Sequence, residues 1–124
     1  MVLSRQTFKR LVEEAIRSLP PPFLARLRNV DVVVEEHPTV QELSAAGVEP
    51  PDTLLGLYTG VPLTERGSWY GNVLPDKITL YQRPMQALCR SRQELRQKVR
   101  EVLMHEIGHH FGLTDRELEE VESS

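Results

Sequence analysis

The sequence lacks the features that mark secreted and membrane proteins. Cys89 is its only cysteine, so no disulfide can form within the chain, and a reducing compartment is the simplest setting. No stretch approaches the roughly 20 apolar residues that a membrane helix needs. Residues 1–19 mix apolar and charged side chains, unlike a secretory signal. We therefore expect a cytoplasmic protein without a membrane partner.

The chain also lacks a strong charge of either sign. Its net charge is −3, with 27% charged residues, whereas binding to nucleic acid needs a concentrated basic surface. We therefore expect no nucleic-acid partner. The 124 residues, 40% of them hydrophobic, are enough to build one core but not two. The sequence thus predicts a single domain over residues 1–124.

Hydrophobic periodicity predicts a helix at the start of the chain and strands in its middle. Ser4 or Thr7 can cap the first helix, whose apolar residues recur at helical spacing from 8 to 19 before the prolines at 20–22 end it. In chain order, the further predicted segments are a strand at 29–36, a short helix at 39–46, a strand at 53–59, a loop at 61–76 and a strand at 77–83. A loop this long is often functional, and its Trp69 and Tyr70 either contact substrate or pin the loop to the core.

A longer helix is predicted to begin at Ser91, where Glu94 follows three residues later in the pattern of a capping box. The apolar stripe of this helix consists of Leu95, Val99, Val102, Leu103 and Ile107. Gly112 is the predicted stop, and a second capping box then opens a short helix at 115–121. Cys89, just before the long helix, is expected to be a small buried residue.

The end of this helix carries the motif H-E-I-G-H at residues 105–109. His105 and His109 are separated by about 6 Å of rise and about 40° of rotation, so both imidazoles can reach one cation. Glu106 projects about 100° from His105, which suits accepting a proton from a metal-bound water better than direct ligation. His110 is turned away from His109 by a similar angle and is expected to pack or to support the site. The motif therefore predicts metal-assisted hydrolysis.

A catalytic zinc site needs at least a third protein ligand, with one position left for water. Asp115 is the first carboxylate after the turn predicted at Gly112, and Glu119 lies about one helical turn further. Both carboxylates are candidates for the third ligand.

The segment from His105 to Asp115 reads H-E-I-G-H-H-F-G-L-T-D. It resembles the metzincin signature H-E-x-x-H-x-x-G-x-x-H, with Asp115 in place of the last histidine. Further likeness lies in L-G-L-Y at 55–58, G-V-P-L at 60–63, L-P-D at 74–76 and I-T-L-Y at 78–81. Over about half of its length, the chain thus resembles a family of small bacterial proteins, the minimal zincin-like (metzincin-like) metallopeptidases.

The resemblance implies a compact α+β domain, in which a small mixed sheet of about three to four strands packs with an amino-terminal helix and a zincin-like active-site helix. It implies a Zn²⁺ cofactor held by His105, His109 and Asp115, so it favours Asp115 over Glu119. It also implies that Glu106 is the general base. The expected function is a zinc-dependent metallopeptidase that hydrolyses a peptide or protein substrate with a metal-activated water.

The sequence departs from larger metzincins after the motif. No methionine-containing turn follows Asp115, and both Met85 and Met104 precede the motif. We therefore expect the subdomain that forms the lower wall of the substrate cleft to be missing. We also expect the strand at 77–83 to border the cleft and to bond an extended peptide, and Tyr70 or Tyr81 to stabilise the oxyanion.

Two alternative functions remain open. The missing lower wall suggests a non-catalytic metal-binding or interaction module that retains the zincin fold. Another metal-dependent hydrolase, such as an RNA-processing enzyme, is the second alternative, because some bacterial ribonucleases carry a similar histidine frame on a helix. Glu106 and the acidic net charge argue against that second alternative.

Overall fold

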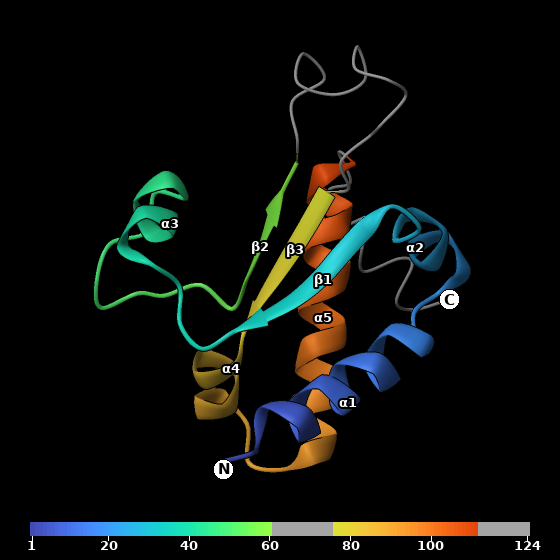
Figure 1. Cartoon of the computed structure of the whole chain (residues 1–124), viewed down its shortest axis with the longest axis horizontal. Coiled ribbons are helices and arrows are strands. Elements are labelled where there is room, and N and C mark those ends of the chain that lie inside the picture. The colour runs from blue at the N-terminus through green and yellow to red at the C-terminus, as the bar shows by residue number, and fades with distance from the viewer. Residues whose placement is uncertain (61–75, 112–124) are drawn as a thin grey trace.

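Five helices and three strands follow one another in the computed structural model, which describes residues 1–60 and 76–111 (Figure 1). In chain order they are α1 (Arg5–Arg17), α2 (Pro21–Arg26), β1 (Val30–Glu35), α3 (Val40–Ala45), β2 (Gly56–Thr59), β3 (Asp76–Tyr81), α4 (Gln82–Leu88) and α5 (Arg92–His110). This is a compact α+β fold with a small mixed sheet, as predicted. The predicted helix at 115–121 and the predicted loop, apart from Asp76, lie outside the described residues.

The strands lie in the order β1-β3-β2, so β3 is the central strand. β1 runs parallel to β3, and β2 runs antiparallel to it. Because the backbone of β3 is paired on both sides, it offers no open edge to a peptide. The expectation that the strand at 77–83 hydrogen-bonds an extended peptide is therefore wrong. Within the described part of the chain, β1 and β2 are the edge strands.

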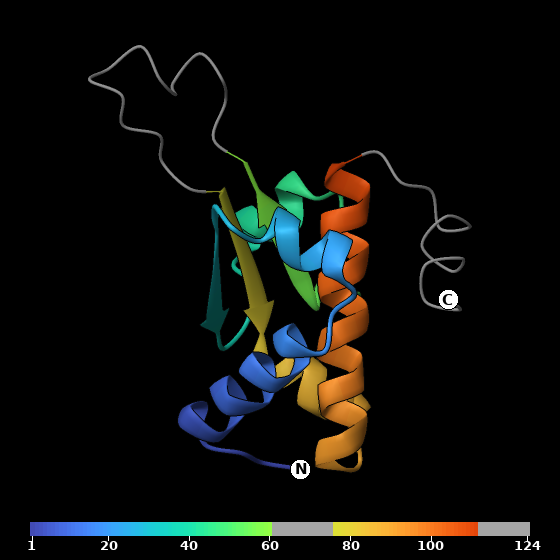
Figure 2. The same ribbon diagram turned by 90° about the vertical axis from the view of Figure 1, so that its right-hand side faces the viewer.

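One face of the sheet packs against α5, which in turn packs against α1, and Figure 2 shows α5 running along the side of the molecule opposite β1. The core between sheet and helices contains Val34, Ile78 and Leu80 from the strands, Phe8, Leu11, Val12 and Ala15 from α1, and Leu95, Val99, Leu103 and Ile107 from α5. These helix residues all belong to the predicted apolar stripes, whereas Val102 of the predicted stripe is only partly buried and Met104, which was not predicted, is fully buried. Cys89 is also buried, with a free thiol, as expected. No helix within the two described ranges is long and apolar enough to cross a membrane.

Serine side chains fix the starts of the two principal helices. Ser4 accepts a hydrogen bond from the Thr7 N–H at 3.1 Å, and Ser91 accepts one from the Glu94 N–H at 3.1 Å. Both residues are N-caps: Ser91 as predicted, and Ser4 as one of the two candidates considered with Thr7. The Glu94 carboxylate departs from the capping-box pattern, since it accepts from the N–H of Arg90 at 2.8 Å. Two local hydrogen bonds therefore set the residue at which α5 begins.

Two short helices were not predicted from the sequence. α2 begins at Pro21, inside the proline run that was expected only to end the first helix, because the fixed φ of proline suits the first helical position. α4 begins at Gln82, although the alternating pattern of β3 continues to Arg83. Pro84 cannot donate to a sheet ladder but is tolerated in the first turn of a helix. The strand therefore ends at Tyr81, two residues earlier than predicted.

Gly56 sets the separation between β2 and α5. A Cβ atom on Gly56 would lie 2.6 Å from Cγ1 of Val102 and 3.3 Å from the carbonyl oxygen of Thr79. Only glycine leaves room for the strand to approach the helix this closely. The approach places Tyr58, two residues further along β2, beside the last turns of α5.

The connection between β1 and β2 carries α3 and is tied to the opposite face of the sheet. Thr39 and Glu42 form a reciprocal capping box at the start of α3, and Gly47 after its end has a φ of 73°. The Tyr81 hydroxyl donates a 2.8 Å hydrogen bond to Oε2 of Glu42. Since Tyr81 alternates with the core residue Leu80 along β3, it points away from α5.

Candidate active site

The last turns of α5 carry the histidine motif. His105, Glu106 and His109 all lie within the helix, which ends at His110. Ile107 is buried against the core, whereas the three motif side chains are partly or fully exposed. The helix thus anchors one face in the core and presents its functional side chains on another. Asp115, Glu119 and Gly112 lie outside the described residues, so the choice of a third ligand stays a prediction.

The two motif histidines lie on neighbouring turns with their rings near one another. The ring centroids of His105 and His109 are 5.8 Å apart, and the ring planes meet at 82°. Nδ1 of His105 lies 2.9 Å from the carbonyl oxygen of Glu101. A carbonyl oxygen only accepts hydrogen bonds, so Nδ1 carries the proton of the neutral ring and Nε2 keeps its lone pair.

Glu106 lies between α5 and the edge of the sheet. Its Oε1 accepts a 2.9 Å hydrogen bond from the backbone N–H of Tyr58. Partial burial raises the pKa of the Glu106 carboxyl, while the Tyr58 N–H and the nearby charges of His109 and His105 act in the opposite direction. Burial has the larger effect because water is displaced from the carboxylate. The side chain is therefore both fixed in position and easier to protonate than an exposed glutamate.

Tyr58 makes two further contacts that join β2 to α5 and β3. Its ring stacks on His110, with centroids 3.9 Å apart and an interplanar angle of 15°. Its hydroxyl donates a 2.7 Å hydrogen bond to Oδ2 of Asp76, which lies 3.8 Å from Nε2 of His110. Asp76 is only 8% exposed. His110 thus packs beside the motif, as expected, and Tyr58 ties three elements together next to Glu106.

Tyr58 and Asp76 were not predicted to belong to the site. The sequence held one indication of their role. Each is the last residue of a segment that resembles the family: L-G-L-Y at 55–58 for Tyr58 and L-P-D at 74–76 for Asp76. Tyr81 lies elsewhere, because its hydroxyl bonds Glu42 on the opposite face of the sheet. The expectation that Tyr81 stabilises an oxyanion is therefore wrong. Tyr70, the other tyrosine considered, lies outside the described residues.

The donor set at the motif consists of two imidazoles and the carboxylate of Glu106. Within residues 1–60 and 76–111, no group of three or more His, Cys, Asp or Glu side chains is arranged to hold a metal ion. Two nitrogen ligands suit zinc, which also needs a third protein ligand in a catalytic site. Oε1 of Glu106 is already engaged with the main-chain N–H of Tyr58.

Comparison with known proteins assigns the chain to a family. Residues 27–124 match the model of the zincin-like metallopeptidases. Among solved structures, a conserved hypothetical protein from Thermo thermophilus is similar, with a TM-score of 0.56 and 25% sequence identity over 87% of this chain and 94% of that one. No curated protein matches the sequence. Because the family model covers most of the chain, including the whole sheet and α5, this protein belongs to the zincin-like metallopeptidase family.

Proposed function

We propose that this chain is a zinc-dependent peptidase in which Glu106 acts as the general base. One observation carries the proposal: the Glu106 carboxylate is held at the edge of β2 by the Tyr58 N–H, on the helix that carries His105 and His109. A carboxylate in this position combines a fixed geometry with a raised pKa. Both properties favour general-base catalysis.

His105 and His109 are the residues that we assign as metal ligands. The bond from Nδ1 of His105 to the Glu101 carbonyl supports the assignment, because it leaves Nε2 of that ring able to coordinate. Asp115 is the third ligand that we propose from the sequence, with Glu119 as its competitor. Zinc, when bound, lowers the pKa of water and polarises a substrate carbonyl.

The reaction that we propose uses Glu106 twice. Because Oε1 is held by the Tyr58 N–H, we assign proton transfer to Oε2. This oxygen accepts a proton from water as the new C–O bond forms at the peptide carbonyl. It then returns the proton to the leaving amine as the C–N bond breaks.

An extended peptide substrate is best accommodated along β2. This strand lies at the edge of the sheet nearest the motif. Its Tyr58 N–H points away from β3 and is already bonded to Glu106, so a peptide would pair with the remaining main-chain groups of this edge. A peptide that adds to such an edge receives main-chain hydrogen bonds that do not depend on its sequence. We therefore propose a peptide or protein substrate bound beside β2 in place of the predicted strand at 77–83.

The test compares three forms of the full chain for zinc content and for cleavage of a peptide library. Glu106→Gln keeps an oxygen that can accept from Tyr58 but loses the base, so it should retain zinc and lose about 10²–10⁴-fold in rate. His105→Ala should lose zinc as well as activity. Equal turnover by wild type and Glu106→Gln would contradict the mechanism. Zinc binding without cleavage by the wild type would instead favour a metal-binding module.

A further inference from the structure

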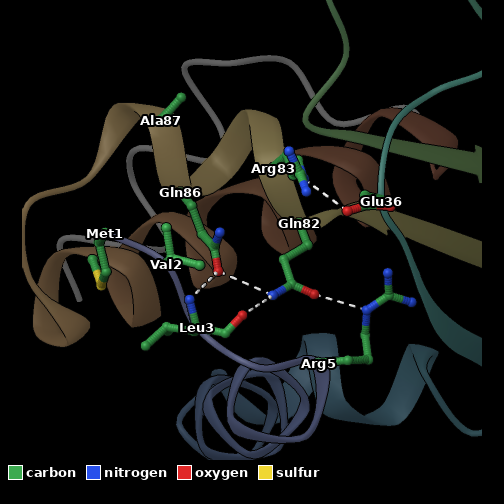
Figure 3. A pocket seen from close by; sticks show the side chains of 9 residues that line it. All are labelled: Met1, Val2, Leu3, Arg5, Glu36, Gln82, Arg83, Gln86 and Ala87. Carbon is green, nitrogen blue, oxygen red and sulfur yellow. Dashed lines mark hydrogen bonds and ion pairs between the residues drawn. The ribbon is translucent and has the colours of Figure 1, made fainter.

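A pocket of about 400 Å³ lies at the end of the molecule opposite the motif. Figure 1 shows the amino terminus and α4 at this end, whereas the last turn of α5 lies at the other. The pocket is lined by residues 1–3 and Arg5 of the amino-terminal segment, by Glu36 after β1, and by Gln82, Arg83, Gln86 and Ala87 of α4 (Figure 3). It shares no residue with the candidate active site.

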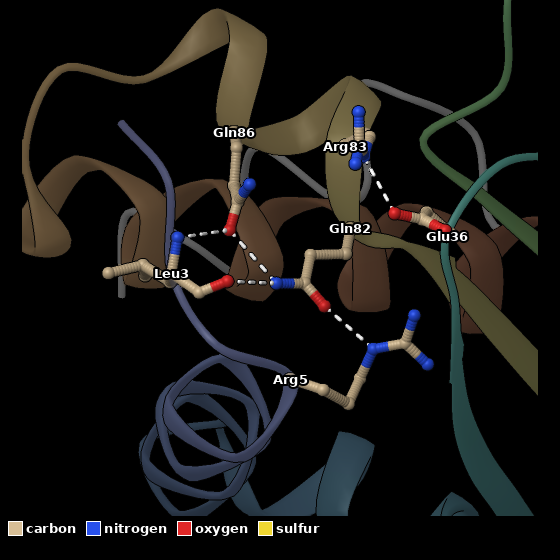
Figure 4. Close-up of polar contacts among 6 residues, drawn as sticks. All are labelled: Leu3, Arg5, Glu36, Gln82, Arg83 and Gln86. Carbon is tan, nitrogen blue, oxygen red and sulfur yellow. Dashed lines mark hydrogen bonds and ion pairs between the residues drawn. The ribbon is translucent and has the colours of Figure 1, made fainter.

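A network of hydrogen bonds fixes the polar side chains of this pocket (Figure 4). Gln82 and Gln86 are only 5% and 7% exposed. Oε1 of Gln82 accepts from Nε of Arg5 at 2.8 Å, and its Nε2 donates to the Leu3 carbonyl and to Oε1 of Gln86, both at 3.0 Å. Nη1 of Arg5 also donates to the carbonyl of Val34 at 3.0 Å. The polar groups are therefore held in place before any ligand arrives.

The same network determines which way each glutamine amide points. Gln82 must present its oxygen to Arg5, because a guanidinium only donates. Its nitrogen therefore faces Gln86, whose oxygen accepts both from it and from the Leu3 N–H at 3.2 Å. The amide nitrogen of Gln86 then lies on the side away from Leu3, as Figure 4 shows. No residue in the described ranges accepts a hydrogen bond from this nitrogen, and since no buried side-chain nitrogen or oxygen there lacks a partner, the nitrogen is open to solvent at the pocket.

The pocket has an excess of positive charge and of hydrogen-bond donors. Arg5 and Arg83 contribute two guanidinium groups, against the single carboxylate of Glu36, which pairs with Nε of Arg83 at 2.7 Å. Each guanidinium has five N–H donors, and the bonds within the network use two from Arg5 and one from Arg83. The group that complements this wall is an anion with more than one acceptor oxygen.

We propose that this pocket binds a small organic oxyanion, whose carboxylate or phosphate oxygens contact Arg5, Arg83 and the Gln86 amide. The volume suits a small molecule. The side chains of Val2, Leu3 and Ala87 supply an apolar wall for a short carbon chain. The proposal does not depend on peptidase activity, since the pocket and the motif lie at opposite ends of the molecule.

The test titrates the full ¹⁵N-labelled chain with butyrate and, separately, with inorganic phosphate, using sodium chloride at equal ionic strength as a control. We expect saturable shifts at the Gln86 side-chain amide and at the Arg5 and Arg83 Nε–H signals with at least one anion, and none with chloride. Tighter binding of butyrate would identify a carboxylate ligand. Tighter binding of phosphate would identify a phosphate ester. The absence of saturable shifts with both anions would overturn the proposal.

Gln86→Glu is the sharpest variant for this test. It keeps the oxygen that accepts from Leu3 and Gln82, but replaces the amide donor by a second carboxylate oxygen, so anion binding should weaken at least about tenfold. Arg83→Gln should also weaken binding about tenfold, and because Arg83 is exposed its loss leaves the core intact. Arg10→Gln removes one charge from an exposed position on α1 and should have no effect. Unchanged binding in Arg83→Gln, or an equal loss in Arg10→Gln, would contradict the site.

Discussion

The backbone N–H of Tyr58 donates a 2.9 Å hydrogen bond to Oε1 of Glu106, a residue 48 positions away in the chain. The two meet because Gly56 lets β2 lie against α5. The main chain of a paired strand has no rotamers to exchange, so this donor holds the carboxylate more firmly than a flexible side chain would. The general base that we propose is therefore positioned by the sheet as well as by its own helix.

The bond between Tyr58 and Asp76 should contribute measurably to stability. Tyr58→Phe removes the hydroxyl that donates to the buried Asp76 carboxylate, and we expect the free energy of unfolding to fall by about 1–3 kcal/mol. Urea denaturation measures the change. In a double-mutant cycle with Asp76→Ala, the two substitutions should couple by about 0.5–3 kcal/mol. Additive effects would show that the hydroxyl acts independently of Asp76.

Gly56→Ala should force β2 and α5 apart. The added methyl group would lie 2.6 Å from Cγ1 of Val102, and overpacking of this kind costs about 1–3 kcal/mol. Chemical denaturation should therefore show a less stable protein. Adding Val102→Ala to the Gly56→Ala variant removes the clashing atom and should recover part of the loss. If Val102→Ala only lowers stability further, the contact between residue 56 and Val102 does not cause the loss of stability in Gly56→Ala.

Glu42 should make stability depend on pH. The N–H of Thr39, followed by the Tyr81 hydroxyl, lowers the pKa of the Glu42 carboxyl below its usual 4.5 against the opposing effect of burial. A carboxyl whose pKa is lower in the folded state stabilises the fold above its unfolded pKa, and this contribution is lost as pH falls through the folded pKa. Glu42→Gln should therefore melt at a lower temperature than wild type at neutral pH.

Thermal unfolding at a series of pH values checks this sign. The difference in melting temperature between wild type and Glu42→Gln should shrink as the pH falls below 4.5. Glu13→Gln, on the exposed side of α1, is the control for a general loss of negative charge. A difference in melting temperature that stays constant down to the lowest pH measured would show that ionisation of Glu42 does not cause it.

The part of α5 that precedes the motif should be intolerant of cavities. Leu103 is fully buried in the core cluster that also holds residues of α1 and the sheet, so Leu103→Ala should cost about 2–5 kcal/mol of unfolding free energy. Leu88 is 61% exposed at the end of α4, and Leu88→Ala should change stability by no more than about 0.5 kcal/mol. Equal effects of the two substitutions in urea denaturation would refute the assignment of the core.

Local patterns predicted the elements whose physical causes are local. Ser91 caps its helix as the sequence indicates, and Ser4, one of two candidate caps, caps the first, because an N-cap bonds backbone groups only two or three residues away. The alternating valines at 30, 32 and 34 likewise form β1. The same reasoning failed at Gln82, where alternation continued but the chain turned into α4. Alternation describes which faces are apolar, and it does not show where pairing with a neighbouring strand stops.

The sequence by itself determined the motif, since the spacing of His105, Glu106 and His109 on one helix follows from the helical repeat and needs no distant contact. Only the tertiary structure decided what surrounds the motif. Pairing of β3 on both sides excluded it as the strand that bonds a peptide, and the fit of Gly56 against Val102 brought Tyr58 to Glu106. These relationships join residues that are tens of positions apart in the chain. Strand order and side-chain packing bring such residues together, and local periodicity encodes neither.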